Sequence, residues 1–434
     1  MAIINYNNGY YDGNVNYSGE EDGYGSFVWT NGGKYVGYWR RGAMEGTGTY
    51  YYPDGARYEG QWVNNARTGQ GKLFYADGAR YEGGFYNNDR HGRGTMYYSD
   101  GAVYVGEWYN NVRTGQGTLT WREGDRYEGR WQNDRRRGEG KYFWPNGVWY
   151  EGYFVDDVRT GHGVMHYSDG VFEGEFINGK REGLGRFKHT DGYTYEGEWR
   201  DDNHIKTTKF IYTDGSWYEG DFDGWARHGR GTYHYTDGAV YVGMWKEGKK
   251  SGKGRMSFAD GGTYDGDWED DSRNGHGRTT FPDGSVHEGN WVEGARTGYG
   301  TMHYTDGTRY EGQWSFGQRT SGKLYYRDST YEGTFTDDKH TGYGHLSYKN
   351  GEWYYGAFAD GRRHGRGRMC YSDGTSYDGE WENDIPMGDG CYTAANGDEY
   401  RGIFSGLSCE DATCYTADGR ILHGMLKNGK FTEE

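Results

Sequence analysis

Residues 58–83 read YEGQWVNNARTGQGKLFYADGARYEG, and the three letters that open this stretch return at its end. The period of 23 residues runs from Tyr35 to Tyr400, with two steps that are one or two residues shorter. Self-similarity at a fixed period of roughly 20 to 50 residues is the signature of a repeat architecture. The sequence therefore predicts about 19 tandem units, with an irregular unit near Tyr11 and a partial unit at Leu422.

Each unit is predicted to form two β-strands joined by tight turns. Tyr58, Gly60 and Trp62 stand at alternate positions, and residues 69–75 place two glycines, a leucine and a tyrosine in the same way. Alternate residues of a strand share a face, so one face carries rings and glycines and the other carries mostly polar residues. Asp-Gly, as at 77–78, is a typical hairpin signal because glycine accepts a positive φ at little cost.

The composition favours a thin sheet whose apolar face is made of rings. Aromatic residues are 18% of the chain, although all hydrophobic residues together are only 33%. A chain this poor in Leu, Ile and Val cannot fill a thick core, whereas its aromatic content argues against disorder. Glycine inside the strands is expected to give the rings a flat floor. A lone hairpin is marginal, so stability is expected to come from stacking neighbouring hairpins.

The pattern Y-E-G-x-W followed by G-x-G-x-x-x-x-x-D-G resembles the MORN (membrane occupation and recognition nexus) family, over nearly all of residues 11–434. The resemblance implies an all-β fold: an elongated, single-layer antiparallel sheet of about 19 tandem β-hairpins, twisted into a rod with an aromatic and glycine groove. We expect an irregular N-terminal repeat over 1–34, tandem MORN repeats over 35–399, and degenerate C-terminal repeats over 400–434.

The face that carries the rings is the first candidate interaction surface. A single-layer sheet leaves part of such a face open, and exposed aromatic grooves mark binding sites in which Trp and Tyr serve as anchors. Alternatively, the sheet curls until the rings cover one another. The predicted partner-binding residues are Tyr58, Trp62, Tyr75, Tyr81, Phe85, Tyr98, Tyr104, Trp108, Trp121 and Trp131.

A recurring basic position is the second candidate surface. Stacked hairpins place it along one edge, at intervals of roughly 10 Å. Such a row suits phosphoinositides or acidic protein tails. The favoured alternative is that each arginine orders its own turn, because Asn and Asp precede it in the same loop. The arginines singled out are Arg67, Arg90, Arg113, Arg136, Arg159 and Arg296.

Three units depart from the pattern. Thr207 stands in the region of the glycine pair of one unit, and another reads RTSGKLYYRDSTY, with Ser321 before its single glycine. These breaks are interpreted as bends, as partner sites or, preferentially, as drift in a tolerant array. The unit at Tyr400 has neither glycine and is expected to cap the sheet, since an open edge is a pairing liability. If the end is not capped, two chains are predicted to pair edge to edge through their terminal repeats and form a homodimer.

No catalytic or metal-binding constellation is evident. His162 and His166 lie four residues apart, about 13 Å along a strand, which is too far for one metal ion. Cys391, Cys409 and Cys414 lack a recognisable zinc spacing.

So few cysteines favour a reducing, intracellular setting. Neither a signal peptide nor a run of ~18 apolar residues is seen, so a soluble protein without cofactor or metal is expected.

The functional expectation follows from these features. The net charge of −16 disfavours nucleic acid and, less strongly, anionic membranes as partners. Proteins that resemble this family are common in cytoskeletal and ciliary assemblies, including radial spokes. We expect a non-catalytic scaffold that binds other proteins, in the cytoplasm and at the cytoskeleton or cilium. The alternative is a peripheral membrane module that binds phosphoinositides or other anionic phospholipids through the arginine row.

Overall fold

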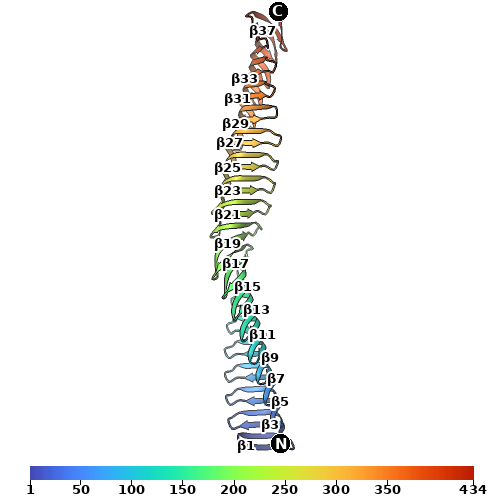
Figure 1. Ribbon diagram of the computed structural model, residues 1–434, viewed down its shortest axis with the longest axis vertical. Helices are drawn as coiled ribbons and strands as arrows, with labels where there is room; N and C mark the ends of the chain where they lie inside the picture. The colour runs from blue at the N-terminus through green and yellow to red at the C-terminus, as the bar shows by residue number, and fades with distance from the viewer. The chain divides into compact units, whose positions relative to one another are not determined.

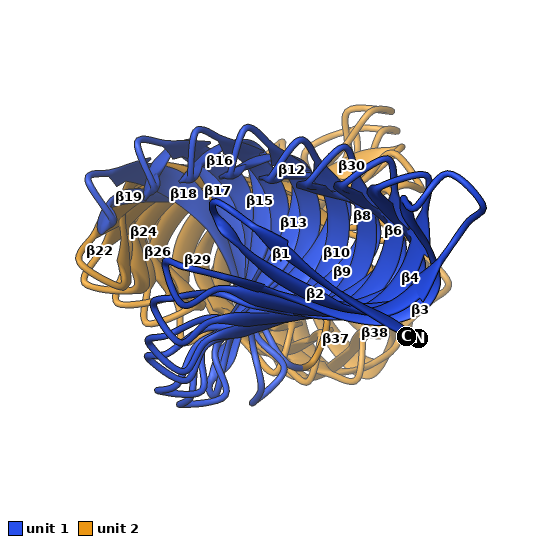
Figure 2. Cartoon of the chain, turned by 90° about the horizontal axis from the view of Figure 1, so that it is seen from below, with its two compact units in different colours: residues 1–213 blue, residues 214–434 orange.

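Tight turns divide the chain into short strands of similar length. The computed structural model describes residues 1–434, which form 39 β-strands and no helix. The chain divides into two compact units, residues 1–213 and residues 214–434, which Figure 2 colours separately. The predicted divisions after residue 34 and after residue 399 stay predictions, because the sheet continues through both points.

Unit 1 contains the strands β1 (Ala2–Tyr6), β2 (Gly9–Val15), β3 (Glu21–Trp29), β4 (Lys34–Arg40), β5 (Ala43–Tyr51), β6 (Arg57–Val63), β7 (Ala66–Phe74), β8 (Arg80–Tyr86), β9 (Asp89–Tyr97), β10 (Val103–Tyr109), β11 (Val112–Thr120), β12 (Arg126–Gln132), β13 (Arg135–Phe143), β14 (Trp149–Val155), β15 (Val158–Tyr167), β16 (Gly170–Ile177), β17 (Lys180–His189), β18 (Thr194–Arg200) and β19 (Asn203–Ile211).

Unit 2 contains the strands β20 (Trp217–Asp223), β21 (Ala226–His234), β22 (Val240–Lys246), β23 (Lys249–Ser257), β24 (Thr263–Glu269), β25 (Ser272–Thr280), β26 (Val286–Val292), β27 (Ala295–His303), β28 (Arg309–Ser315), β29 (Gln318–Tyr325), β30 (Ser329–Thr336), β31 (Lys339–Tyr348), β32 (Trp353–Ala359), β33 (Arg362–Cys370), β34 (Ser376–Glu382), β35 (Ile385–Thr393), β36 (Glu399–Ser405), β37 (Ser408–Tyr415), β38 (Ile421–Lys427) and β39 (Lys430–Glu433).

The strands of each unit pair in chain order. Every strand is antiparallel to the one before it and the one after it, as β6, β7 and β8 show in unit 1 and β31, β32 and β33 show in unit 2. Figure 1 shows the hairpins of each unit lying side by side in the order of the chain. The prediction of an all-β, open antiparallel sheet built from about 19 hairpins is confirmed.

Two kinds of turn alternate along the chain. Asn64 and Asn65 both have positive φ, 47° and 63°, and form a two-residue loop between paired Val63 and Ala66. This is the type I′ geometry that matches the twist of a hairpin. The other turn uses Asp77, whose Oδ1 accepts a hydrogen bond of 2.9 Å from the backbone N–H of the residue two positions on. Both turns are local, so the sequence signals for them were sufficient.

The core of each unit is a continuous stack of rings. The Tyr58 side chain is fully buried, and its ring meets Trp62 of its own repeat edge-on at 5.2 Å and Phe85 of the next repeat at 5.0 Å. The Tyr58 hydroxyl donates a hydrogen bond of 3.1 Å to the carbonyl of Gln61, and burial raises its pKa. Trp62 Nε1 donates to the carbonyl of Gly48 in the preceding repeat at 3.2 Å. Each repeat is therefore stabilised mainly by its neighbours.

The glycines of the motif have two different roles. A Cβ added to Gly60 or Gly71 would lie 2.4 Å and 2.3 Å from the Tyr58 hydroxyl oxygen, which confirms that these glycines form a floor for the ring. Gly69 acts through its backbone instead. It has a φ of +64° and lies in a β-bulge, because Gly60 pairs with Gly71 whereas Gln61 pairs with Thr68. A bulge of this kind bends its strand.

Candidate interaction surfaces

The rings predicted to bind a partner lie in the core. Tyr58, Trp62, Tyr81, Phe85, Tyr104, Trp108 and Trp131 are between 0% and 4% exposed, and Tyr75, Tyr98 and Trp121 are half-buried against them. The sequence left open whether these rings line an open groove or cover one another. In the structure these side chains cover one another. The rings pack against one another because a single-layer sheet has no second layer to cover its apolar face. Partner binding by these residues stays a prediction.

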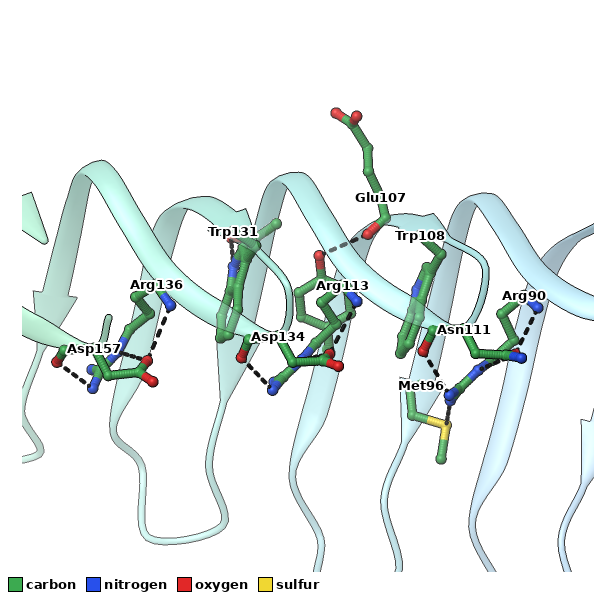
Figure 3. Close-up of polar contacts among 12 residues, drawn as sticks. Arg90, Met96, Glu107, Trp108, Asn111, Arg113, Trp131, Asp134, Arg136 and Asp157 are labelled. Atoms are coloured by element: carbon green, nitrogen blue, oxygen red, sulfur yellow. Dashed lines mark hydrogen bonds and ion pairs between the residues drawn. The ribbon is translucent and has the colours of Figure 1, made fainter. Parts of the chain in front are cut away.

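The arginine row joins one repeat to the next. Arg113 Nε lies 2.9 Å from Asp134 Oδ1, and its terminal nitrogen donates to the carbonyl of the same residue at 2.9 Å. The guanidinium carbon lies 4.3 Å from the centre of the Trp131 ring, and the side chain is 18% exposed. Figure 3 shows the same arrangement for Arg90 and Arg136. Hydrogen bonds and a cation–π contact thus fix the guanidinium group of each of these arginines.

All six predicted arginines make this contact with a turn in the next repeat. Arg67 bonds to Asn88, Arg90 to Asn111, Arg113 to Asp134, Arg136 to Asp157, Arg159 to Gly179 and Arg296 to Gly317. The favoured interpretation, in which each arginine orders its own turn, is corrected: the turn belongs to the following hairpin, because antiparallel stacking places that loop beside it. Burial lowers the pKa of Arg159 and Arg296. The sequence signal for this contact, which the sequence analysis missed, is the Asn, Asp or Gly that follows each arginine by 20 or 21 residues.

The polar face of unit 1 forms a groove that the sequence did not predict. The groove has a volume of about 1540 Å³ and follows strands β6 to β15. The glycines of the floor contribute backbone to it. The side chains that line it are Glu59, Gln70, Lys72, Glu82, Arg93, Thr95, Val105, Gln116, Thr118, Glu128, Glu139, Lys141, Glu151, Tyr153, His162 and Val164.

Ion pairs across neighbouring strands neutralise much of this groove. Lys72 lies 3.6 Å from Glu82, and Lys141 lies 3.1 Å from Glu151. Between these pairs the groove has a less charged centre, where Val105 is 52% exposed. The two ion pairs keep acidic and basic groups at both ends of this centre. The groove therefore offers an elongated, mixed polar surface, which suits a protein segment better than a compact ligand.

No group of three or more His, Cys, Asp or Glu side chains is placed to hold a metal ion. The four cysteines are free thiols. No helix suited to crossing a membrane is present.

A family model described as MORN repeat matches the chain at residues 10–34, 35–57, 58–80, 81–103, 104–126, 127–148, 150–171, 172–192, 195–204, 218–240, 241–263, 264–286, 287–309, 310–330, 331–353, 354–376 and 377–399. The search of curated proteins gave no match.

Solved structures resemble the chain only distantly. The TCP domain of SAS-4 (dCPAP) from Drosophila melanogaster is 12% identical, with a TM-score of 0.25, and the match covers 40% of this chain and 89% of that chain. The TCP10 domain of Danio rerio CPAP is also 12% identical, with a TM-score of 0.15, over 55% of this chain and 92% of that chain. TM-scores this low carry no argument about fold or function.

Proposed function

Because the chain belongs to the MORN-repeat family, we propose that it is a non-catalytic structural scaffold that binds other proteins in a cytoskeletal or ciliary, radial-spoke-like assembly. Repeats of this family mediate protein or membrane interactions. The observation that supports a protein partner is the elongated groove on the polar face of unit 1, lined by charged, amide, hydroxyl, aliphatic and aromatic side chains. We place the binding surface there because the rings of the opposite face are occupied by one another.

The structure lends less support to the membrane alternative. A peripheral membrane module would use the arginine row to bind phosphoinositides or other anionic phospholipids. Each of the six arginines already donates hydrogen bonds to the next turn, so lipid binding would have to displace those contacts. The net charge of −16 also repels an anionic surface at low salt.

The proposal is tested by proximity labelling in the native cell with the full chain. The groove variant is Val105→Glu, which adds a charge at the exposed centre of the groove. Its matched control is Val242→Glu, because Val242 occupies the same repeat position in unit 2 and is 48% exposed, against 52% for Val105. We expect cytoskeletal or ciliary proteins among the labelled partners of the native chain and of the control, and their loss in the groove variant.

A set of labelled proteins that does not change in Val105→Glu would refute the groove as the binding surface. Labelling confined to membrane proteins, together with flotation on phosphoinositide vesicles that is lost in Arg113→Gln, would favour the alternative. Light scattering on the purified chain tests the homodimer, and a monomer at micromolar concentration would exclude stable pairing through terminal repeats.

A further inference from the structure

The polar face changes character in unit 2, at strands β31 to β33. The residue that follows the buried tyrosine of a repeat is usually acidic, as Glu311 is, but in one repeat it is Tyr355, which is 57% exposed. Tyr343 on the preceding strand is 64% exposed. Trp353 lies two residues before Tyr355 and therefore on the same face. Three large rings thus lie together at one place on the polar face.

The sheet register brings these rings together. His345 of β31 pairs with Tyr355 of β32, and its ring lies 6.4 Å from Tyr355 and 6.0 Å from Trp353. Tyr343, Trp353, Tyr355 and His345 line one groove of about 700 Å³, together with Glu332 and Arg368. Apolar atoms make up a larger share of the surface of this groove than of the groove of unit 1.

The groove carries one cation that has no partner. Glu332 is neutralised by Lys323 at 3.1 Å. Arg368 faces Tyr355 on one side and Asp378 on the other in the register, yet no carboxylate lies within ion-pair distance of its guanidinium. Elsewhere on the polar face Arg57 is paired with a glutamate at 2.8 Å and stacked on a ring at 4.4 Å. Arg368 makes neither contact and is exposed beside the rings.

We propose that the groove at β31–β33 binds an extended acidic peptide segment of a partner protein. The apolar side chains of the segment lie on Tyr343, Trp353 and Tyr355, and one of its carboxylates pairs with Arg368. An extended segment suits the site because its side chains alternate with a period close to that of the strands beneath it. An unpaired arginine beside apolar surface forms a charge-assisted hydrogen bond with a carboxylate.

A short segment is favoured over a larger anionic surface by the charge of the whole chain. At physiological salt, charges interact over about 8 Å, so a short segment responds mainly to Arg368. A membrane or a nucleic acid would also meet acidic residues in the turns of the same unit, such as Asp337. The site deepens the proposed scaffold function by naming the chemistry of one partner, and it does not depend on the groove of unit 1.

The test is fluorescence anisotropy on the full chain with labelled octapeptides. In the peptides, leucine, phenylalanine or tyrosine stands at two alternate positions and glutamate at the next position of the same alternation, with serine between, so that an extended segment turns these side chains to one face. Tyr355→Glu installs the residue common in other repeats, and Arg368→Thr installs the residue that Thr301 provides at the same position. The matched control is Arg255→Thr, which removes the same charge at the same repeat position outside the groove.

We expect at least one peptide to bind with a Kd below 1 mM, and the affinity to fall at least tenfold in Tyr355→Glu and in Arg368→Thr but not in Arg255→Thr. Raising the salt concentration should weaken the binding. Equal affinity for peptides with lysine in place of glutamate overturns the proposal, as does the absence of binding below 1 mM. Anionic vesicles that bind through the same two residues would identify a membrane instead. Loss of partners in Val105→Glu tests the other groove, so the two proposals can fail separately.

Discussion

The repeat that begins at Tyr104 and the repeat that begins at Tyr195 differ in the residue that pairs with the glycine of the first strand. In the first, Gly117 lies under Tyr104, whose ring meets Trp108 edge-on at 5.2 Å with an interplanar angle of 90°. In the second, Thr207 pairs with the glycine of the first strand and is 2% exposed. The Tyr195 ring there lies nearly parallel to Trp199, at 5.9 Å and 17°.

The difference shows that the floor glycine decides where the tyrosine ring lies. A side chain at the glycine position occupies the space of the ring, and the register of β18 and β19 shifts at two places to accommodate it. His204 lies edge-on to both displaced rings, at 5.2 Å from Tyr195 and 5.1 Å from Trp199. Unit 1 ends at residue 213, inside this irregular repeat. Four substitutions test this comparison.

Replacing the floor glycine should have the largest effect. Gly117→Thr places a Cβ about 2.3 Å from the Tyr104 hydroxyl oxygen, and neither the ring nor the paired backbone can move freely. We expect a loss of about 3 kcal/mol or more in the local stability of β10 and β11. Hydrogen exchange of these strands measures it, with Gln116→Thr on the opposite face as the control. Unchanged protection in Gly117→Thr would show that the glycine is not a floor.

The second test concerns the repeat in which His287 replaces the buried tyrosine. Neither ring nitrogen of His287 has a hydrogen-bond partner, and burial lowers its pKa from 6.5 to about 4. Its neutral form is therefore favoured in the folded state, so stability is fully present above pH 6.5 and falls as the pH decreases toward 4. We expect β26 and β27 to lose about 2 kcal/mol between pH 7 and pH 5. His287→Tyr should remove most of this pH dependence of hydrogen exchange, and an equal loss in the variant would contradict the assignment.

The third test breaks the contact between repeats at Arg113. Arg113→Gln removes the hydrogen bonds to Asp134 and the stacking on Trp131. Because Asp134 is about half exposed, the expected loss is only about 1.5 kcal/mol, and it should appear in the turn that contains Asp134 as well as in β11. Arg130→Gln on the polar face is the control. Destabilisation confined to the turn preceding Arg113 would restore the interpretation in which each arginine orders its own loop.

The smallest effect is expected from the tyrosine hydroxyl. Tyr104→Phe removes the hydrogen bond of 3.1 Å to the carbonyl of Glu107, at a cost of about 1 kcal/mol. The chain already contains this change, since Phe172 occupies the same position and is also fully buried. Tyr109→Phe, on an exposed side chain, is the control for hydrogen exchange in β10. A loss as large as that of Gly117→Thr would mean that the hydroxyl, and not the ring, holds the repeat together.

The sequence predicted most of the fold because the information is local and repeated. Alternation around Tyr58 and Trp62 indicated strands, and Asp77 marked a turn. The same pattern could not separate Gly69 from Gly71, because a bulge and a floor use the same residue type for different reasons. The sequence also identified the arginine row but assigned each side chain to its own loop. The contact between Arg113 and Asp134 spans 21 residues and exists only once neighbouring hairpins are aligned.

The sequence by itself therefore determined the repeat unit, the faces of its strands and the antiparallel order of the hairpins, since each of these depends on a residue and its nearest neighbours in the chain. Only the tertiary structure decided which face offers a surface to other molecules. The strands bend at recurring bulges and the rings pack against the next repeat, so the aromatic face is filled and the polar face is hollowed. Curvature and burial arise from many repeats acting together, and no single repeat encodes them.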